Sequence, residues 1–239
     1  MTPDQPFRGL DPEKLIATAD TLHHRIAERF PDSGLSRLAL ELHETSRRTA
    51  AIARRLAAPI RWLRALVVLC SGLAVAAFVG SLLFLQGTPK LFASVAEFFQ
   101  GLDAFISELV FVGVALVFLF TVENRIKRSR ALKSLYLLRS LAHIIDMHQL
   151  TKHPERGAGG VRDTPSSPQR VLTPFELTRY LDYCSEMLAL LSKLAALHTQ
   201  HFDDPVTLEA VNDVENLTQG LARTIWQKIM ILDRVHDAG

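Results

Sequence analysis

The stretches that decide the fold are Ala65–Leu85, ALVVLCSGLAVAAFVGSLLFL, and Phe105–Val122, FISELVFVGVALVFLFTV. The first carries no charged residue and has the length of about 20 residues with which an α-helix crosses the hydrocarbon of a bilayer. The second carries a single charged residue, Glu108, near its amino end. Together they predict a two-span transmembrane helical hairpin, which we assign to residues 61–124 of an all-α chain.

Basic residues flank the two apolar stretches on one side. They precede the first stretch and follow the second, whereas the connection Gln86–Ala104 offers only Lys90. Because basic residues collect on the cytoplasmic side of a membrane, we expect both termini in the cytoplasm. The Ala-, Leu- and Arg-rich composition is typical of a bacterial inner-membrane protein. The orientation residues are Arg54, Arg55, Arg61, Arg64, Arg125, Lys127, Arg128, Arg130 and Lys133.

The connection between the spans has a pattern of its own. After the Gly87-Thr88-Pro89 break, apolar residues recur at helical spacing from Leu91 to Leu102, with polar residues largely between them. This pattern is typical of a helix that lies in the membrane interface. We therefore expect a short external interfacial helix over about 88–103.

Four further segments are expected in the cytoplasm. Residues 1–60 form N-terminal helices, the second of which continues into the first span as one long helix bent near Pro59. Residues 125–153 continue the second span. Residues 154–172 are rich in Gly, Pro and Ser and predict a flexible linker, and residues 173–239 predict an antiparallel helical hairpin.

The cytoplasmic helices show clear starts and apolar seams. Asp11-Pro12 and Thr173-Pro174 have the residue types of an N-cap followed by proline at the first helical position. Residues spaced three and four apart predict a coiled-coil bundle. The seams are Leu15, Ala19, Leu22, Ile26, Phe30; Leu35, Leu38, Leu42, Thr45, Thr49, Ile52, Leu56; Leu177, Leu181, Cys184, Leu188, Leu191, Ala195, His198, Phe202; and Leu208, Val211, Val214, Leu217, Leu221, Ile225, Leu232, Val235.

The histidines are the only candidates for a metal site. His143 shares a helical face with Asp146, but His148 points away from it, and His198 and His201 form a second pair at helical spacing. No CxxC or HExxH motif is present. We expect no metal and no cofactor, with His198 packed and hydrogen-bonded inside the bundle.

Three acidic residues near the outer ends of the spans suggest a cation channel as an alternative function. Glu97, Asp103 and Glu108 could form acidic rings at an outer mouth in a homo-oligomer. The architecture is broadly similar to that of the mitochondrial-type calcium uniporters, which would imply cation conduction. Their tryptophan-aspartate and glutamate-proline selectivity motif has no counterpart in residues 99–103.

Gly72, Ala76 and Gly80 form a ladder of small residues on the first span. Such ladders let helices approach closely in lipid, either within one hairpin or between subunits. We therefore interpret the chain as a non-enzymatic, self-associating membrane scaffold for signalling or protein interaction. Its partners would be the bilayer, a second copy of the chain and a cytosolic protein, but not nucleic acid. A helical-bundle metal protein or enzyme ranks third, after the channel.

Overall fold

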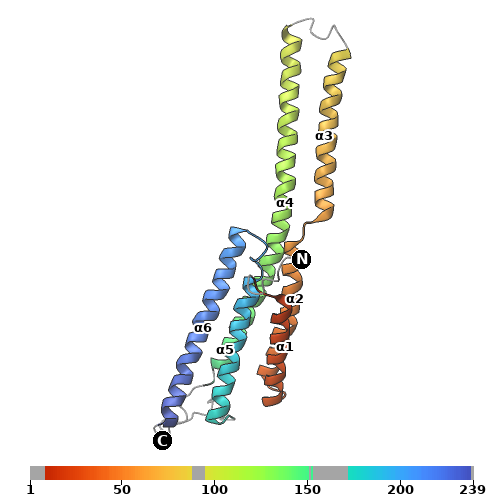
Figure 1. The fold of residues 1–239 in the computed structure, drawn as a ribbon. Coiled ribbons are helices and arrows are strands. Elements are labelled where there is room, and N and C mark those ends of the chain that lie inside the picture. Colours follow the sequence, from red (N-terminus) through yellow and green to blue (C-terminus); the bar gives the residue numbers. More distant parts are fainter. Residues whose placement is uncertain (1–8, 88–94, 151, 153–171, 238–239) are drawn as a thin grey trace. The chain divides into compact units, whose positions relative to one another are not determined.

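Helices are the regular secondary structure of the part of the chain that the structure describes. A computed structural model describes residues 9–87, 95–150, 152 and 172–237, and in these residues there are six α-helices and no strand. The helices are α1 (Pro12–Arg29), α2 (Gly34–Ala57), α3 (Arg61–Gly87), α4 (Val95–Leu150), α5 (Pro174–Ala196) and α6 (Pro205–Asp237) (Figure 1). The all-α prediction is confirmed.

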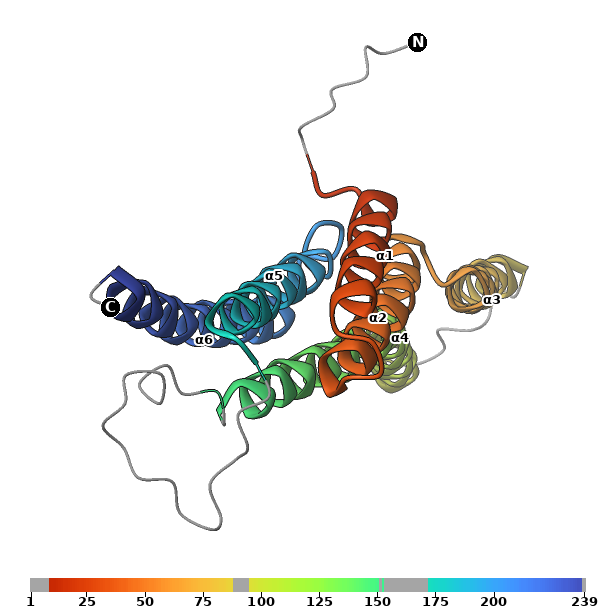
Figure 2. The ribbon, with the colours of Figure 1, turned by 90° about the horizontal axis from the view of Figure 1, so that it is seen from below.

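The chain divides into two compact units. The first, which we call the core unit, comprises Met1–Ala57 and Arg128–Gly239, and the second, the apolar unit, comprises Ala58–Lys127. In the core unit α1 packs beside α2, and α5 contacts α1, α2 and α6 (Figure 2). One hydrophobic cluster draws side chains from α1, α2, α4, α5 and α6, so the core unit has a continuous interior of its own.

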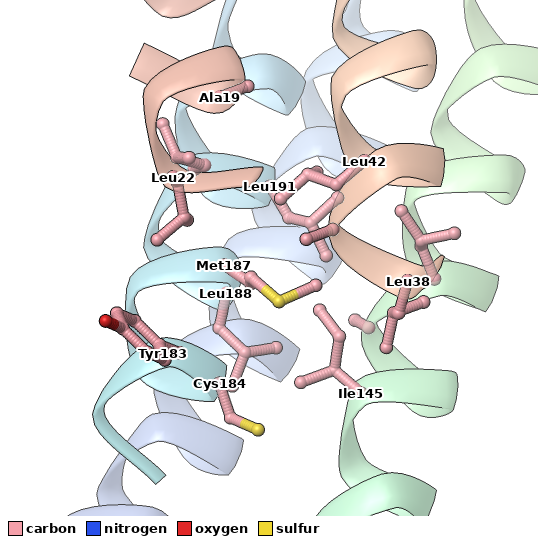
Figure 3. Packing of buried hydrophobic residues seen from close by; sticks show 14 of the residues in the cluster. Ala19, Leu22, Leu38, Leu42, Ile145, Tyr183, Cys184, Met187, Leu188 and Leu191 are labelled. Carbon is pink, nitrogen blue, oxygen red and sulfur yellow. The ribbon is translucent and has the colours of Figure 1, made fainter. Parts of the chain in front are cut away.

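The predicted seams form most of this interior. Figure 3 shows Leu22 of α1, Leu42 of α2 and Ile145 of α4 directed toward Met187 and Leu191 of α5. The largest fully buried side chains are Ile26, Leu35, Leu42, Leu56, Leu135, Leu138, Ile145, Leu181, Met187, Leu188, Leu191 and Leu194.

One of the described seam positions is wrong, and the side chain of Val235, the last predicted position, lies outside the described part of the structure. Leu208, predicted on the apolar edge of α6, is 46% exposed, because the buried stripe at this end of α6 runs instead through Thr207 and Val211.

The predicted helix starts are confirmed in detail. The Asp11 carboxylate accepts a hydrogen bond from the Glu13 backbone N–H at 2.9 Å, with Pro12 as the first helical residue of α1. Thr173 and Glu176 form a reciprocal capping box at the start of α5, in which each side chain accepts from the other residue's backbone N–H. These caps satisfy donors that the first turn of a helix leaves free.

The expected continuous helix through Pro59 is wrong. α2 ends at Ala57 and α3 begins at Arg61, with a non-helical segment between them. Proline has no backbone N–H, and it also pushes the preceding residue away from helical dihedrals. Together these two effects end a helix here rather than bending it.

The helix α4 begins earlier in the sequence than the predicted second span and includes residues that were expected to form a separate helix. The predicted interfacial helix over 88–103 does not exist as a separate element, since residues 95–103 are the first turns of α4 and residues 88–94 lie outside the described residues. No proline interrupts residues 95–150, so nothing in the sequence stops the helix. A helix was expected to continue from the second apolar stretch over residues 125–153, and α4 does continue to Leu150. The expected linker over residues 154–172 lies almost entirely outside the described residues.

The helix α5 is shorter than predicted. It ends at Ala196, and residues 197–204 connect it to α6. Two side chains compete for its last carbonyl groups, because His198 Nδ1 lies 3.1 Å from the Ala195 oxygen and Thr199 Oγ1 donates to the Ala196 oxygen. Such local side-chain hydrogen bonds offer the backbone an alternative to another helical turn.

Two helical stretches, within Gly34–Ala77 and Leu109–Leu150, are long and apolar enough to cross a membrane. In each of the two stretches, almost none of the most apolar residues is buried by the rest of the chain. In the apolar unit the exposed side chains include Val68, Leu73 and Val75 of α3, and Phe111 and Val117 of α4. An apolar surface of this extent is unusual on a helix that faces water.

Candidate functional site

The acidic residues of the predicted outer mouth all lie on α4. Asp103 is exposed, and the side chains of Glu97 and Glu108 are outside the described part of the structure. At 100° per residue, Glu97 and Glu108 lie about 20° apart around the helix and Asp103 lies about 120° or more from both. The continuity of α4 therefore does not bring the three acids to one face.

The small-residue ladder of α3 is open. Gly72, Ala76 and Gly80 are all exposed, and no atom lies within 4 Å of the point where a Cβ would stand on Gly72 or Gly80. The predicted packing of these glycines against the second apolar stretch of the same chain is therefore not seen among the described residues. The ladder is available to a second helix.

Four of the nine orientation residues pair with carboxylates. Arg54 pairs with Glu13, Arg64 and Lys127 with Glu123, and Arg128 with Asp204. The other five side chains are exposed, and they are Arg55, Arg61, Arg125, Arg130 and Lys133.

Glu123 joins the first turn of α3 to α4 within the apolar unit. Its carboxylate lies 3.0 Å from Lys127 Nζ and 3.6 Å from Arg64 Nε. It also accepts a hydrogen bond of 3.3 Å from the Ile60 backbone N–H, which precedes α3. A carboxylate at the amino end of a helix is favourable because the helix dipole is positive there.

Asp204 joins α4 to the start of α6 within the core unit. Its Oδ1 accepts from Arg128 Nε at 2.9 Å, and its Oδ2 accepts from the Thr207 backbone N–H at 2.9 Å and from the Thr207 hydroxyl at 2.8 Å. Burial alone would raise the pKa of Asp204, but the bonds from Arg128 and Thr207 outweigh it and hold the pKa below its ordinary value. Asp204 thus acts both as the N-cap of α6 and as a partner of α4.

The histidines do not converge. Among the described residues no group of three or more His, Cys, Asp or Glu side chains could hold a metal ion. His198 and His201 lie beyond the end of α5, so the helical face that they were expected to share does not exist. His198 is fully buried, as predicted, while His201 and His143 are exposed and His148 is half-buried. Burial lowers the pKa of His198 and so favours the neutral ring.

Cys184 also lies inside the core unit. Its side chain is fully buried, and burial raises the pKa of the thiol to about 12. A neutral, buried thiol is a poor nucleophile and metal ligand. Cys184 therefore packs as a small apolar residue, as its position in the seam predicted.

A hollow between α1 and α5 was not predicted. It has a volume of about 540 Å³ and is lined by Arg25, Glu28 and Arg29 of α1 and by Arg179 and Tyr183 of α5. The only signal in the sequence is that Arg25 and Arg29 lie one turn apart on the face of α1 beside its apolar stripe. Their meeting with Arg179 depends on tertiary packing, which that spacing does not reveal.

The guanidinium groups of this hollow are placed on aromatic rings. The Arg25 Cζ lies 5.4 Å from the Tyr183 ring centroid, and the Arg29 and Arg179 Cζ atoms lie 5.9 and 5.6 Å from that of Phe175. Tyr183 is buried at 4% exposure, whereas Phe175 is 60% exposed. Arginine placed over an aromatic ring is attracted by the ring's negative face.

Two of the three arginines have carboxylate partners on α5. Arg25 donates hydrogen bonds from Nη1 and Nη2 to the two carboxylate oxygens of Glu186, at 3.0 and 3.5 Å. Arg179 Nη1 lies 3.4 Å from Asp182 Oδ2. Within the described part of the chain no carboxylate lies within ion-pair distance of Arg29. Comparisons with protein-family models, with curated proteins and with solved structures found no match.

Proposed function

We propose that this chain is a membrane-embedded scaffold that self-associates and presents its core unit to partner proteins in the cytoplasm. The observation that carries the proposal is the contrast between the two units. The core unit closes a continuous interior of its own, whereas the apolar unit leaves the apolar side chains of α3 and α4 uncovered. A bilayer is the environment that suits the second unit, and the first needs no further cover to fold.

Both termini of the proposed scaffold face the cytoplasm of a bacterial inner membrane. The distribution of basic residues supports this orientation. Exposed basic residues precede the first apolar stretch, at Arg55 and Arg61, and follow the second, at Arg125, Arg130 and Lys133. Trp62 is 64% exposed beside them, which suits an aromatic anchor at the membrane interface.

Self-association is proposed to use the ladder face of α3. Gly72 and Gly80 are open to a neighbouring helix, and because glycine has no side chain, two helix backbones can approach each other closely in lipid at these positions. The simplest closed arrangement is a symmetric dimer, in which the same face of α3 meets itself.

The mass of the complex in nanodiscs tests this proposal. Wild-type protein is expected to resist alkaline extraction from membranes and to give a mass above that of one 26.7 kDa chain. Ala76→Leu should shift the mass toward the monomer because the larger side chain separates the backbones. Ala74→Leu is the matched control, since it adds the same atoms about 160° away around α3.

Two results would overturn the proposal. Release of the chain by alkaline extraction would show that the apolar unit is not embedded in the bilayer. A monomeric mass of the wild-type chain across protein concentrations would rule out self-association.

A further inference from the structure

We propose that the hollow between α1 and α5 binds an acidic peptide segment of a partner protein, with carboxylates on its arginines and an apolar or aromatic side chain against Phe175. This inference rests on the proposed scaffold and names the chemistry of its cytosolic partner. The hollow is formed by Arg25, Glu28, Arg29, Arg179 and Tyr183.

The arginines supply the attraction for carboxylates. Three guanidinium groups and one carboxylate line the hollow, and the planar fork of arginine matches a carboxylate with two parallel hydrogen bonds. Arg29 is exposed, its guanidinium group lies over the Phe175 ring, and no described carboxylate lies within ion-pair distance of it. It is the first contact that we assign to an acidic ligand.

The existing ion pairs of Arg25 and Arg179 do not block the site. Their side chains are 50% and 47% exposed, and exposed ion pairs contribute little to stability. Each guanidinium group has five N–H donors, so an incoming carboxylate can bind the remaining donors of Arg25 and Arg179 while Glu186 and Asp182 stay in place. These pairs also hold the two guanidinium groups in place before a ligand arrives, which reduces the entropy lost on binding.

The aromatic residues supply the apolar contact. Tyr183 forms a rigid floor, because the Phe30 ring packs against it edge-on at a centroid distance of 6.3 Å. Phe175 is 60% exposed, and its ring lies beneath the guanidinium groups of both Arg29 and Arg179, two residues that line the hollow. Arginine and aromatic residues are the types most enriched among the strongly contributing residues of protein interfaces.

The position of the hollow favours a soluble partner over a lipid headgroup. Tyr180, on the same helix as Tyr183, donates a hydrogen bond of 3.4 Å to the His148 carbonyl near the end of α4. Arg128, which belongs to the basic set expected beside the membrane, precedes His148 by about 30 Å along α4. The hollow and the membrane-side basic residue Arg128 thus lie at opposite ends of the core unit.

Isothermal titration of the full chain in nanodiscs of neutral lipid tests the inference. The probe is a synthetic pentapeptide with a central tryptophan between two glutamates and two aspartates, and the control peptide carries four lysines instead. The acidic peptide should bind one site per chain and the lysine peptide should not. Arg29→Gln and Phe175→Ala should each weaken binding, with a loss of about 10-fold or more expected for the arginine.

Arg47→Gln is the matched control for loss of one positive charge. Arg47 is exposed on α2, away from the residues that line the hollow, so the variant should bind like the wild type. Because Arg29 and Phe175 are exposed, their variants should keep the wild-type circular dichroism spectrum and thermal midpoint. Those measurements separate loss of the site from loss of the fold.

Three results would overturn the inference: no binding of the acidic peptide, equal binding by Arg29→Gln and wild type, or binding of phosphatidylserine vesicles without binding of the peptide. Membrane extraction and complex mass, measured on the same preparation, report separately on the proposed scaffold. An embedded, self-associated chain that ignores the acidic peptide would refute this inference alone.

Discussion

Replacing Asp204 with alanine should destabilise the core unit by about 3 kcal/mol. About 1 kcal/mol comes from loss of the α6 N-cap. About 2 kcal/mol comes from leaving the hydroxyl of Thr207, which is fully buried, without its acceptor. For a chain of this size the sum corresponds to a fall of about 6–12 °C in the thermal midpoint, measured by circular dichroism of the full chain in nanodiscs.

Two variants separate the cap from the charge. Asp204→Asn keeps a capping oxygen but loses the charged interaction with Arg128, so it should fall between alanine and wild type. Asp203→Ala is the matched control, because Asp203 is the exposed neighbour of Asp204. Equal midpoints for Asp204→Ala and Asp203→Ala would refute the reasoning.

The pH dependence of stability tests the contribution of the Asp204 charge separately from that of the N-cap. The folded pKa of Asp204 lies below its unfolded value of about 3.9, so the charged form contributes stability in full above that value. This contribution is lost as the pH falls through the folded pKa. The difference between wild type and Asp204→Asn should therefore be constant from pH 5 to pH 7 and shrink only in more acidic buffers.

Three further predictions concern buried side chains of the core unit. Because burial holds the folded pKa of His198 below its unfolded value of about 6.5, stability should fall as the pH drops below that value. The variant His198→Gln should flatten the pH dependence of the thermal midpoint, whereas the variant of the exposed His201, His201→Gln, should not. Cys184 should resist alkylation by iodoacetamide at pH 7.5 until denaturant is added, and labelling of the native chain at the denatured rate, read by mass spectrometry, would contradict its burial. Ile26→Ala, at a side chain with 0% exposure, should lower the free energy of unfolding by about 2–5 kcal/mol in urea titrations, and a loss below that of a surface substitution would contradict the described packing.

Local sequence signals predicted the parts of the fold that local physics decides. Asp11 and Thr173 cap the helices that they were expected to cap, because a cap needs only a few neighbouring residues. The seams of α1, α2 and α5 are buried almost as predicted, since one helical face must leave water. The two helical stretches long and apolar enough to cross a membrane follow from length and composition alone.

The errors arise where two local effects compete. Pro59 can bend a helix or end it, and the sequence does not say which neighbouring contacts compensate the lost hydrogen bond. At the end of α5, His198 and Thr199 take carbonyl groups that further helical turns would have used. The apolar stripe before the second span suits an interfacial helix, but an uninterrupted sequence let α4 extend through it.

The hollow could not be predicted because its residues meet only through the packing of α1 on α5. Arg25 and Arg29 look like ordinary solvated charges on an amphipathic helix, and Arg179 and Phe175 lie about 150 residues further along the chain. Such a site has no spacing motif. It can be identified only once the three-dimensional positions of the aromatic rings beneath the guanidinium groups are known.

The Glu123 carboxylate at the amino end of α3 has a consequence for biosynthesis. The hydrogen bond from the Ile60 N–H to Glu123 joins residues 63 positions apart in the chain. At the usual rates of translation, about 3–13 s separate the synthesis of the two residues. During that interval the nascent first apolar stretch carries Arg64 without its anion, so the contacts of Glu123 at the start of α3 form only after the second apolar stretch has been synthesised.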